Sequence, residues 1–298
     1  MKNNKFANFA LLMLLACCWG PSFLFIKVAL EYFEPITLTL YRVGVAAILL
    51  HLILRFSKVE FPDLTNYWRH FLFLGIVGSA LPFTLFNFAE QTVSSSLASI
   101  FNGMVPLMTI IIAHFATKDD QLTKNKFWGA TLGFVGLAIL VAPKFFGVKA
   151  TIVGIIMLMV AVSCYSVAFV YSRRYIQGLN PLISSVMQLS FAALILLPFS
   201  IIFESPAQIS NIPAKPVIAL LSLSVLGTSF AFILLYKIIE LTSASYVSMV
   251  NYIIPVIGIL LGVVVLHESL SWSSVVGCLV IMSGVMTANG IFKRKKVK

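Results

Sequence analysis

Two asparagines in apolar stretches, Asn102 and Asn251, carry carboxamides that could hydrogen-bond a small polar molecule inside a membrane. They stand 149 residues apart (251 − 102), and the same offset relates a serine before each one and a proline after it. On an α-helix each set shares one face, because its spacing is i, i+3, i+7. The two sets are Ser99, Asn102 and Pro106, and Ser248, Asn251 and Pro255.

Each of these prolines removes a backbone donor and frees a carbonyl one turn earlier, beside the asparagine. We therefore expect helix kinks at Pro106 and Pro255. Two roles stay open for Asn102 and Asn251 at equal weight, because intramembrane amides either contact a substrate or bond one helix to another. Ser99 and Ser248 share these faces and are assigned to the same substrate site.

A second repeated face combines aromatic side chains with a cation. Trp19, Phe23 and Lys27 recur as Tyr165, Phe169 and Arg173 at an offset of 146 residues (165 − 19). We interpret the four aromatic residues as walls of a substrate site and Lys27 as an attractor for a substrate carboxylate. Arg173 is interpreted as a snorkelling side chain that reaches the cytoplasmic headgroups.

Arg42 lies about two turns inside an apolar stretch, beyond easy snorkelling reach, and its repeat partner is the neutral Gln188. A buried guanidinium needs a carboxylate, a phosphate or carbonyl groups. Two interpretations stay open. Either Arg42 pairs with Glu31 or Glu34 and latches an outer gate, or it faces a cavity and binds an anionic group of the substrate.

Catalytic and metal chemistry is not expected from this sequence. It contains no HExxH, GxSxG or GxxxxGK[ST] motif, and its four cysteines lack metal-ligand spacing. No catalytic residue, metal site or cofactor is therefore predicted, and the chain is not expected to be an enzyme. No carboxylate falls at mid-membrane, so facilitated diffusion or exchange is expected unless Glu90, Glu240, His51 or His114 takes up protons.

The elements that must position these residues are membrane spans. Hydrophobic residues make up 60% of the 298 residues, charged residues only 10%, and the mean hydropathy is +1.00. Because a span needs about 20 apolar residues, the sequence predicts an all-α membrane protein with ten transmembrane helices. The predicted spans are 7–29, 36–54, 70–89, 95–115, 127–143, 150–171, 182–203, 216–236, 243–266 and 272–292.

The basic residues fix the expected orientation. Of the 21 Lys and Arg, 16 fall on one side of the ten spans and three, Lys144, Lys149 and Lys215, on the other, while Lys27 and Arg42 lie within spans. This positive-inside bias predicts a multi-pass protein of the cell inner membrane with both termini in the cytoplasm. It also explains the net charge of +11 without nucleic acid as a partner.

The two halves form a duplicated unit. Residues 1–146 and 147–298 each contain five predicted spans, and an odd number makes the second repeat enter the membrane from the opposite side. Glycines on span five and small residues on span ten are expected to close the repeat interface, with a homodimer through these faces as an open alternative. They are Gly129, Gly133 and Gly136, and Gly277, Gly284 and Ala288.

Several segments resemble the drug/metabolite transporter superfamily, specifically its ten-helix EamA-type members. They are Cys18-Trp19-Gly20-Pro21-Ser22-Phe23 with Lys27, the stretch from Pro35 to Arg42, the stretches Asn102 to Pro106 and Asn251 to Pro255, and His267-Glu268-Ser269-Leu270-Ser271-Trp272. Members commonly have Gly-Glu at the exit of span nine, where this chain has His267-Glu268. The resemblance implies two inverted five-helix repeats around a central cavity and a transporter of small metabolites, often an exporter.

The sequence thus predicts a carrier that moves a small metabolite by alternating access. The expected substrate is an amino acid or a related compound with a carboxylate, and the resemblance implies that it is moved outward. The alternative is an efflux carrier for drugs or toxic compounds. A channel or an intramembrane enzyme fits less well, because the polar residues form a pair of sites and no pore-lining ring. The expected partners are a small-molecule substrate and the lipid bilayer.

Overall fold

The structure is a computed structural model, and it describes residues 5–60, 63–93, 98, 101–145, 151–204, 212–257 and 272–288. Within these ranges the chain forms helices and contains no strand. Six helical stretches are long and apolar enough to cross a membrane, and three shorter apolar helices accompany them. The prediction of an all-helical membrane protein is therefore confirmed, while the number of ten spans stays a prediction.

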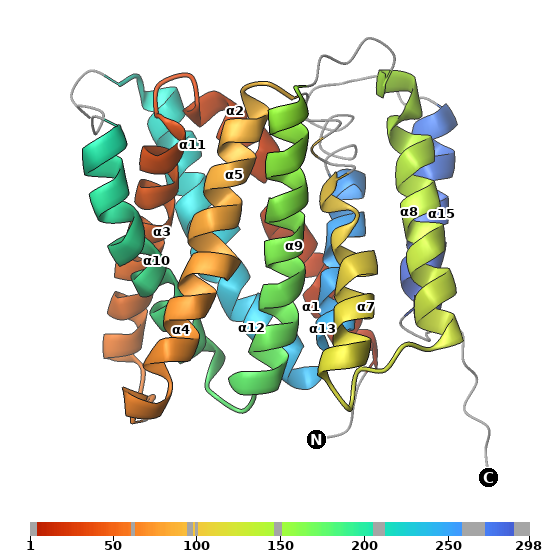
Figure 1. The fold of residues 1–298 in the computed structure, drawn as a ribbon, viewed down its shortest axis with the longest axis horizontal. Helices are drawn as coiled ribbons and strands as arrows, with labels where there is room; N and C mark the ends of the chain where they lie inside the picture. Colours follow the sequence, from red (N-terminus) through yellow and green to blue (C-terminus); the bar gives the residue numbers. More distant parts are fainter. Residues whose placement is uncertain are drawn as a thin grey trace.

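The long helices lie side by side and form a single bundle (Figure 1). In the first half they are α1 (Lys5–Trp19), α2 (Ser22–Ala29), α3 (Pro35–Phe56), η1 (Leu64–Asn66), α4 (Trp68–Gly75), η2 (Ile76–Ala80), α5 (Leu81–Glu90), α7 (Val105–Ala116) and α8 (Lys124–Phe145). In the second half they are α9 (Ile152–Tyr175), α10 (Pro181–Phe203), α11 (Ala214–Ser224), η4 (Val225–Phe230), α12 (Ala231–Leu241), α13 (Ala244–Ser248) and α15 (Trp272–Ala288).

Two of the long helices contain a π-helical segment, η2 or η4, at repeat-related places. In η2, Pro82 cannot donate to the carbonyl of Gly78, and the Leu81 amide instead donates five residues back to Ile76. In η4, the hydroxyl of Thr228 donates to the Leu223 carbonyl at 2.8 Å. Because π-segments widen a helix and often mark functional sites, both places are candidates for substrate contact.

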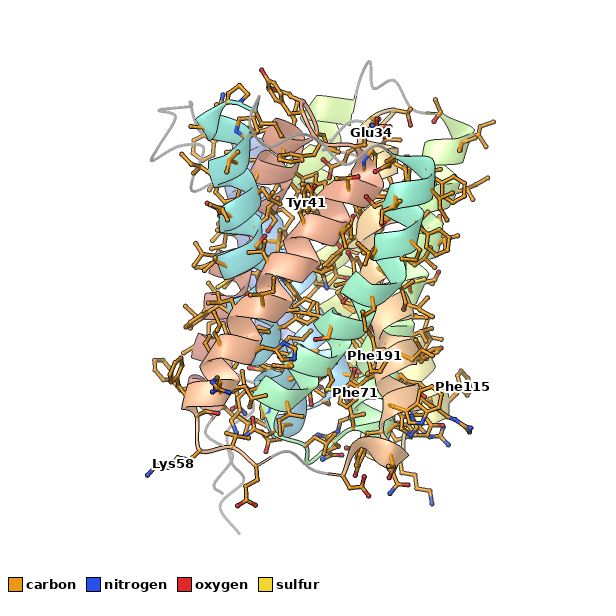
Figure 2. All side chains as sticks on the ribbon, turned by 90° about the vertical axis from the view of Figure 1, so that its left-hand side faces the viewer. Glu34, Tyr41, Lys58, Phe71, Phe115 and Phe191 are labelled. Atoms are coloured by element: carbon orange, nitrogen blue, oxygen red, sulfur yellow. The ribbon has the colours of Figure 1, made fainter. Side chains whose placement is uncertain are left out.

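Large apolar side chains cover the outside of the bundle. Phe56, Phe115 and Trp272 are each more than 80% exposed, at 85%, 83% and 85%. Figure 2 shows side chains projecting outward along the bundle, with Glu34 and Lys58 at opposite ends of it. Such a surface is suited to hydrocarbon and not to water.

Helices α8 and α15 pack against each other at one end of the bundle (Figure 1). A Cβ atom added to Gly129 would lie 2.6 Å from the Gly284 carbonyl oxygen, and one on Gly136 would lie 2.6 Å from the Ile281 nitrogen. The predicted small-residue faces therefore meet within one chain, between the first and the second half. This contact occupies the surfaces that a homodimer would have needed.

Candidate functional site

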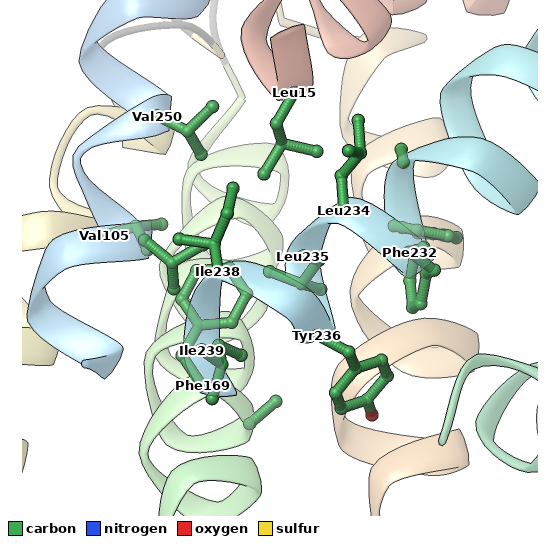
Figure 3. Packing of buried hydrophobic residues seen from close by; sticks show 14 of the residues in the cluster. Leu15, Val105, Phe169, Phe232, Leu234, Leu235, Tyr236, Ile238, Ile239 and Val250 are labelled. Carbon is green, nitrogen blue, oxygen red and sulfur yellow. The ribbon is translucent and has the colours of Figure 1, made fainter. Parts of the chain in front are cut away.

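A central cavity of about 80 Å³ lies between the two halves. Its lining residues come from the first, second, third, fourth, sixth, eighth and ninth predicted spans. They are Trp19, Ser22, Phe23, Ile26, Arg42, Gly78, Phe83, Phe86, Asn87, Asn102, Tyr165, Phe169, Phe232, Leu235, Asn251 and Ile254. Figure 3 shows Phe232 and Leu235 on α12, with Phe169 of α9 in the same buried cluster.

Aromatic rings form much of the cavity wall. Phe83 and Phe232, which are 149 residues apart (232 − 83), meet edge to face at a centroid distance of 6.3 Å. The ring of Phe86 stacks on Tyr165 at 5.8 Å and lies 6.5 Å from Phe23. A wall of this kind binds apolar or planar groups by dispersion and ring contacts.

Arg42 is the cation of the cavity and is only 5% exposed. Its Nε donates to Thr228 Oγ1 at 2.8 Å, and one terminal nitrogen donates to the Gly227 carbonyl at 3.3 Å. The guanidinium carbon lies 4.0 Å from the centre of the Phe83 ring. The other terminal nitrogen, Nη1, has no hydrogen-bond partner among the described residues, so it remains available to a ligand.

The outer-gate latch predicted for Arg42 is not formed in this structure. Glu31 and Glu34 are both exposed, and no ion pair of Arg42 occurs within the described ranges. A different acid, Glu204, occupies the N-terminus of α3, where its carboxylate accepts hydrogen bonds from the Ile36 and Thr37 amides at 3.0 and 2.6 Å. Glu204 lies there because the free amides of a helix N-terminus attract a carboxylate.

Asn102 and Asn251 meet across the repeat interface and also line the cavity. Asn102 Nδ2 donates to Asn251 Oδ1 at 3.1 Å, and Asn251 Nδ2 donates to the Ser248 carbonyl at 2.9 Å. Gly103 and Met104 form a turn between the helical residues 101–102 and the start of α7, just before Pro106. In the ninth span Met249 is a turn residue, six positions before Pro255.

Seven of the ten residues predicted to contact substrate line the cavity: Trp19, Phe23, Arg42, Asn102, Tyr165, Phe169 and Asn251. Trp19 also donates from Nε1 to the Gly227 carbonyl at 3.0 Å.

Two of the remaining three residues, Lys27 and Ser248, do not line the cavity. Lys27 is exposed, although Phe23, one turn earlier on α2, lines the cavity. Ser248 is buried, and its hydroxyl donates a hydrogen bond to the Ser245 carbonyl at 2.9 Å. Ser99 lies outside the described residues, as do His267 and Glu268.

Arg173 does not snorkel as predicted. Its Nε and Nη2 contact one Asp119 carboxylate oxygen at 3.0 and 2.5 Å, and Nη1 donates to the Ile239 carbonyl at 2.8 Å. These hydrogen bonds from Arg173 lower the pKa of Asp119 below its ordinary value. The charge therefore ties α9 to α12 and to the loop before α8, because a partner within reach outcompetes distant headgroups.

Several cavity residues were not predicted, including Ser22, Phe83, Asn87 and Phe232. The pair of Phe83 and Phe232 keeps the 149-residue offset of Gly78 and Gly227, so the repeat register could have found it. Asn87 follows Phe83 by one helical turn and donates to Thr39 Oγ1 at 3.0 Å. Among the described residues, no group of three His, Cys, Asp or Glu comes together as a metal site requires.

Comparison with known proteins gives a consistent picture. The EamA-like transporter family matches the chain twice, over residues 8–142 and 152–290. The chain is 23% identical to the uncharacterized transporter YoaV of Bacillus subtilis over 94% of this chain and 95% of YoaV. It is also 23% identical to protein PecM of Dickeya dadantii, over 100% of this chain and 97% of PecM. A solved crystal structure has a similar fold, with a TM-score of 0.78, 18% identity and coverage of 96% of this chain and 97% of the other.

Proposed function

The chain belongs to the EamA-like transporter family, and from this premise we propose that it carries a small organic anion or zwitterion with a carboxylate through the central cavity. Amino acids and related metabolites are the substrates of this kind, and the proposed direction is outward from the cytoplasm. The proposed mechanism is alternating access of the two repeats about the cavity.

Arg42 is the observation that carries this proposal. It presents a buried positive charge at the cavity without a carboxylate partner among the described residues. A buried charge is stable when a counter-ion or several hydrogen bonds compensate it. The bonds to Thr228 and Gly227 orient the guanidinium and leave Nη1 available, which suits a substrate carboxylate.

Two further groups define what the rest of the substrate would meet. The Ser22 hydroxyl lines the cavity and is buried without a hydrogen-bond partner among the described residues. The paired amides of Asn102 and Asn251 lie at the repeat interface. A polar ligand would satisfy Ser22, while the rings of Phe23, Phe83 and neighbouring aromatic residues would receive an apolar side chain.

A ligand-stabilisation screen of the purified full-length protein against metabolites tests this function. Carboxylate-bearing ligands should raise the unfolding temperature of the wild type, and Arg42→Gln should weaken their binding by about 10- to 100-fold, since a hydrogen bond to a charged group contributes about 1.5–3 kcal/mol. Lys215→Gln removes an exposed charge outside the cavity and serves as the matched control. If only organic cations bind, and bind equally well to Arg42→Gln, efflux of cationic drugs replaces the proposal.

A further inference from the structure

Glu90 ends α5 with a carboxyl group that the site described above does not use. Both of its oxygens are buried and have no hydrogen-bond partner among the described residues, although the residue as a whole is half-buried. Two other acids that are at least half-buried, Glu204 and Glu240, have partners. Glu204 accepts two backbone amides, and Glu240 contacts Lys237 Nζ at 2.8 Å.

An ionised carboxylate in this position would be expensive. Taking an isolated carboxylate out of water costs so much free energy that a buried group without partners becomes neutral by binding a proton. Hydrogen bonds or an ion pair would be the alternative, and neither occurs at Glu90 within the described ranges.

The charged and titratable groups around Glu90 come from three helices. The charges of Lys27 on α2 and Arg42 on α3 act on it, and Glu90 in turn acts on the Tyr165 hydroxyl of α9. The neighbouring segment η2 carries no titratable side chain, and residues 91–104 contain no acidic or basic residue. Lys27 is exposed and Arg42 bonds Thr228 and Gly227, so neither cation neutralises the carboxyl by direct contact.

We infer that Glu90 is a proton-binding site of this carrier, which burial keeps occupied in the present conformation and from which the charges of Lys27 and Arg42 favour release of the proton. A positive charge near a carboxyl favours its ionised form, and removal of that charge favours the protonated form. The coupling of this proton to substrate binding rests on the proposed function. A substrate carboxylate on Arg42 would offset its charge, so that the anion and the proton would bind together by linkage.

Infrared spectroscopy of the ligand-free full-length protein in lipid nanodiscs tests the proton site directly. A protonated carboxyl has a C=O stretch well separated from the bands of a carboxylate. At neutral pH this band should be present in the wild type and lost in Glu90→Gln. Glu240→Gln is the matched control, because it removes the carboxyl near the end of α12 that is already paired with Lys237, and it should keep the band.

Two charge variants test the control of occupancy. Lys27→Gln and Arg42→Gln should each retain the protonated band to higher pH than the wild type. If Glu90→Gln fails to fold, Glu90→Asp keeps a carboxyl and should show the band at a shifted frequency. Identical spectra of the wild type and Glu90→Gln from acidic to basic pH overturn the proton site, as does a band whose pH dependence ignores both charge variants.

The substrate link has a separate readout. Ligand-free spectra do not depend on any substrate, so their failure leaves the proposed transport function untouched. Failure of carboxylates to stabilise the protein in the screen, with the infrared band present and sensitive to Arg42→Gln, overturns the proposed substrate and not the proton site.

Discussion

Arg42 and Gln188 occupy equivalent places in the two repeats, but their surroundings differ. Each reaches a hydroxyl in the π-helical segment of the other repeat: Arg42 Nε donates to Thr228 Oγ1 and Gln188 Nε2 donates to Ser79 Oγ, both at 2.8 Å. Gln188 is then closed off, because the Tyr236 hydroxyl donates to its Oε1. Arg42 lines the cavity, and its Nη1 has no hydrogen-bond partner in the part of the chain that the structure describes.

Duplication thus produced the same contact between the repeats twice, and only one of the two copies carries a charge. Gly78 lets Gln188 approach, since a Cβ there would lie 2.6 Å from Gln188 Nε2. In the other copy, the Gly227 carbonyl instead accepts hydrogen bonds from Trp19 and Arg42. We interpret the neutral copy as a structural closure and the charged copy as the place where the fold can recognise an anion.

The largest effect should come from placing a charge in the neutral copy. Gln188 is 3% exposed and its partners are neutral hydroxyls, so Gln188→Arg should destabilise the protein by about 2.5–3.5 kcal/mol, the insertion cost of Arg near the centre of a span. Thermal unfolding in one detergent measures it. Gln188→Met, which is uncharged, is the control for lost hydrogen bonds. A Gln188→Arg protein as stable as the wild type would make the two copies equivalent.

The next effect separates the two hydroxyls. Thr228→Val removes the acceptor of the Arg42 guanidinium and should cost about 2 kcal/mol, because bonds to charged groups are the stronger ones. Ser79→Ala removes a neutral pair and should cost about 0.6 kcal/mol, the average for such bonds in membranes. Unfolding temperatures of the two variants give the order. Equal losses would show that the charge of Arg42 adds nothing to this contact.

A smaller effect belongs to the asparagines, where the two copies meet each other. Asn102→Ala and Asn251→Ala should each lower stability by about 0.6 kcal/mol, and a double-mutant cycle should show coupling of similar size. If the pair also contacts substrate, stabilisation by a bound carboxylate should fall by more than the unliganded stability does. An unchanged ligand shift in both variants would leave the pair as an interhelical bond alone.

Much of this arrangement could be predicted from the sequence, because it follows from apolar length and from repetition. The spans, the small-residue contact of α8 with α15 and the cavity side chains Trp19, Tyr165 and Asn251 all follow from these two signals. Phe83 and Phe232 also follow the repeat offset, but the spacing of residues on single helices did not predict this pair.

The missed features depend on backbone geometry and on contacts distant in sequence. Extrapolation of the helical face by one turn beyond Phe23 placed Lys27 at the cavity, whereas α2 lines the cavity with Phe23 and Ile26 and leaves Lys27 exposed. The capping acid of α3 is Glu204, 168 residues from Ile36, and no local spacing indicates it. Arg173 finds Asp119 across 54 residues for the same reason.

The smallest effect concerns Lys27 and Arg173, which are equivalent in the repeats but unequal in their contacts. Arg173 lowers the pKa of Asp119, and a carboxyl with a lowered pKa stabilises the fold above its unfolded pKa and loses that contribution as pH falls through the folded value. The stability of the wild type should therefore decline below about pH 4 by more than that of Asp119→Asn.

The difference should stay below about 0.5 kcal/mol, because the Asp119 side chain is 52% exposed and the solvent screens the pair. Thermal unfolding against pH measures it. Arg173→Gln should lose the same pH-dependent increment as Asp119→Asn, although it also loses the bond to the Ile239 carbonyl and so starts from a lower stability. Lys27→Gln, which breaks no bond of this kind, should keep the wild-type pH profile in this acidic range. If the stability of the wild type and of Asp119→Asn declined equally at low pH, the ion pair with Asp119 would not distinguish Arg173 from Lys27.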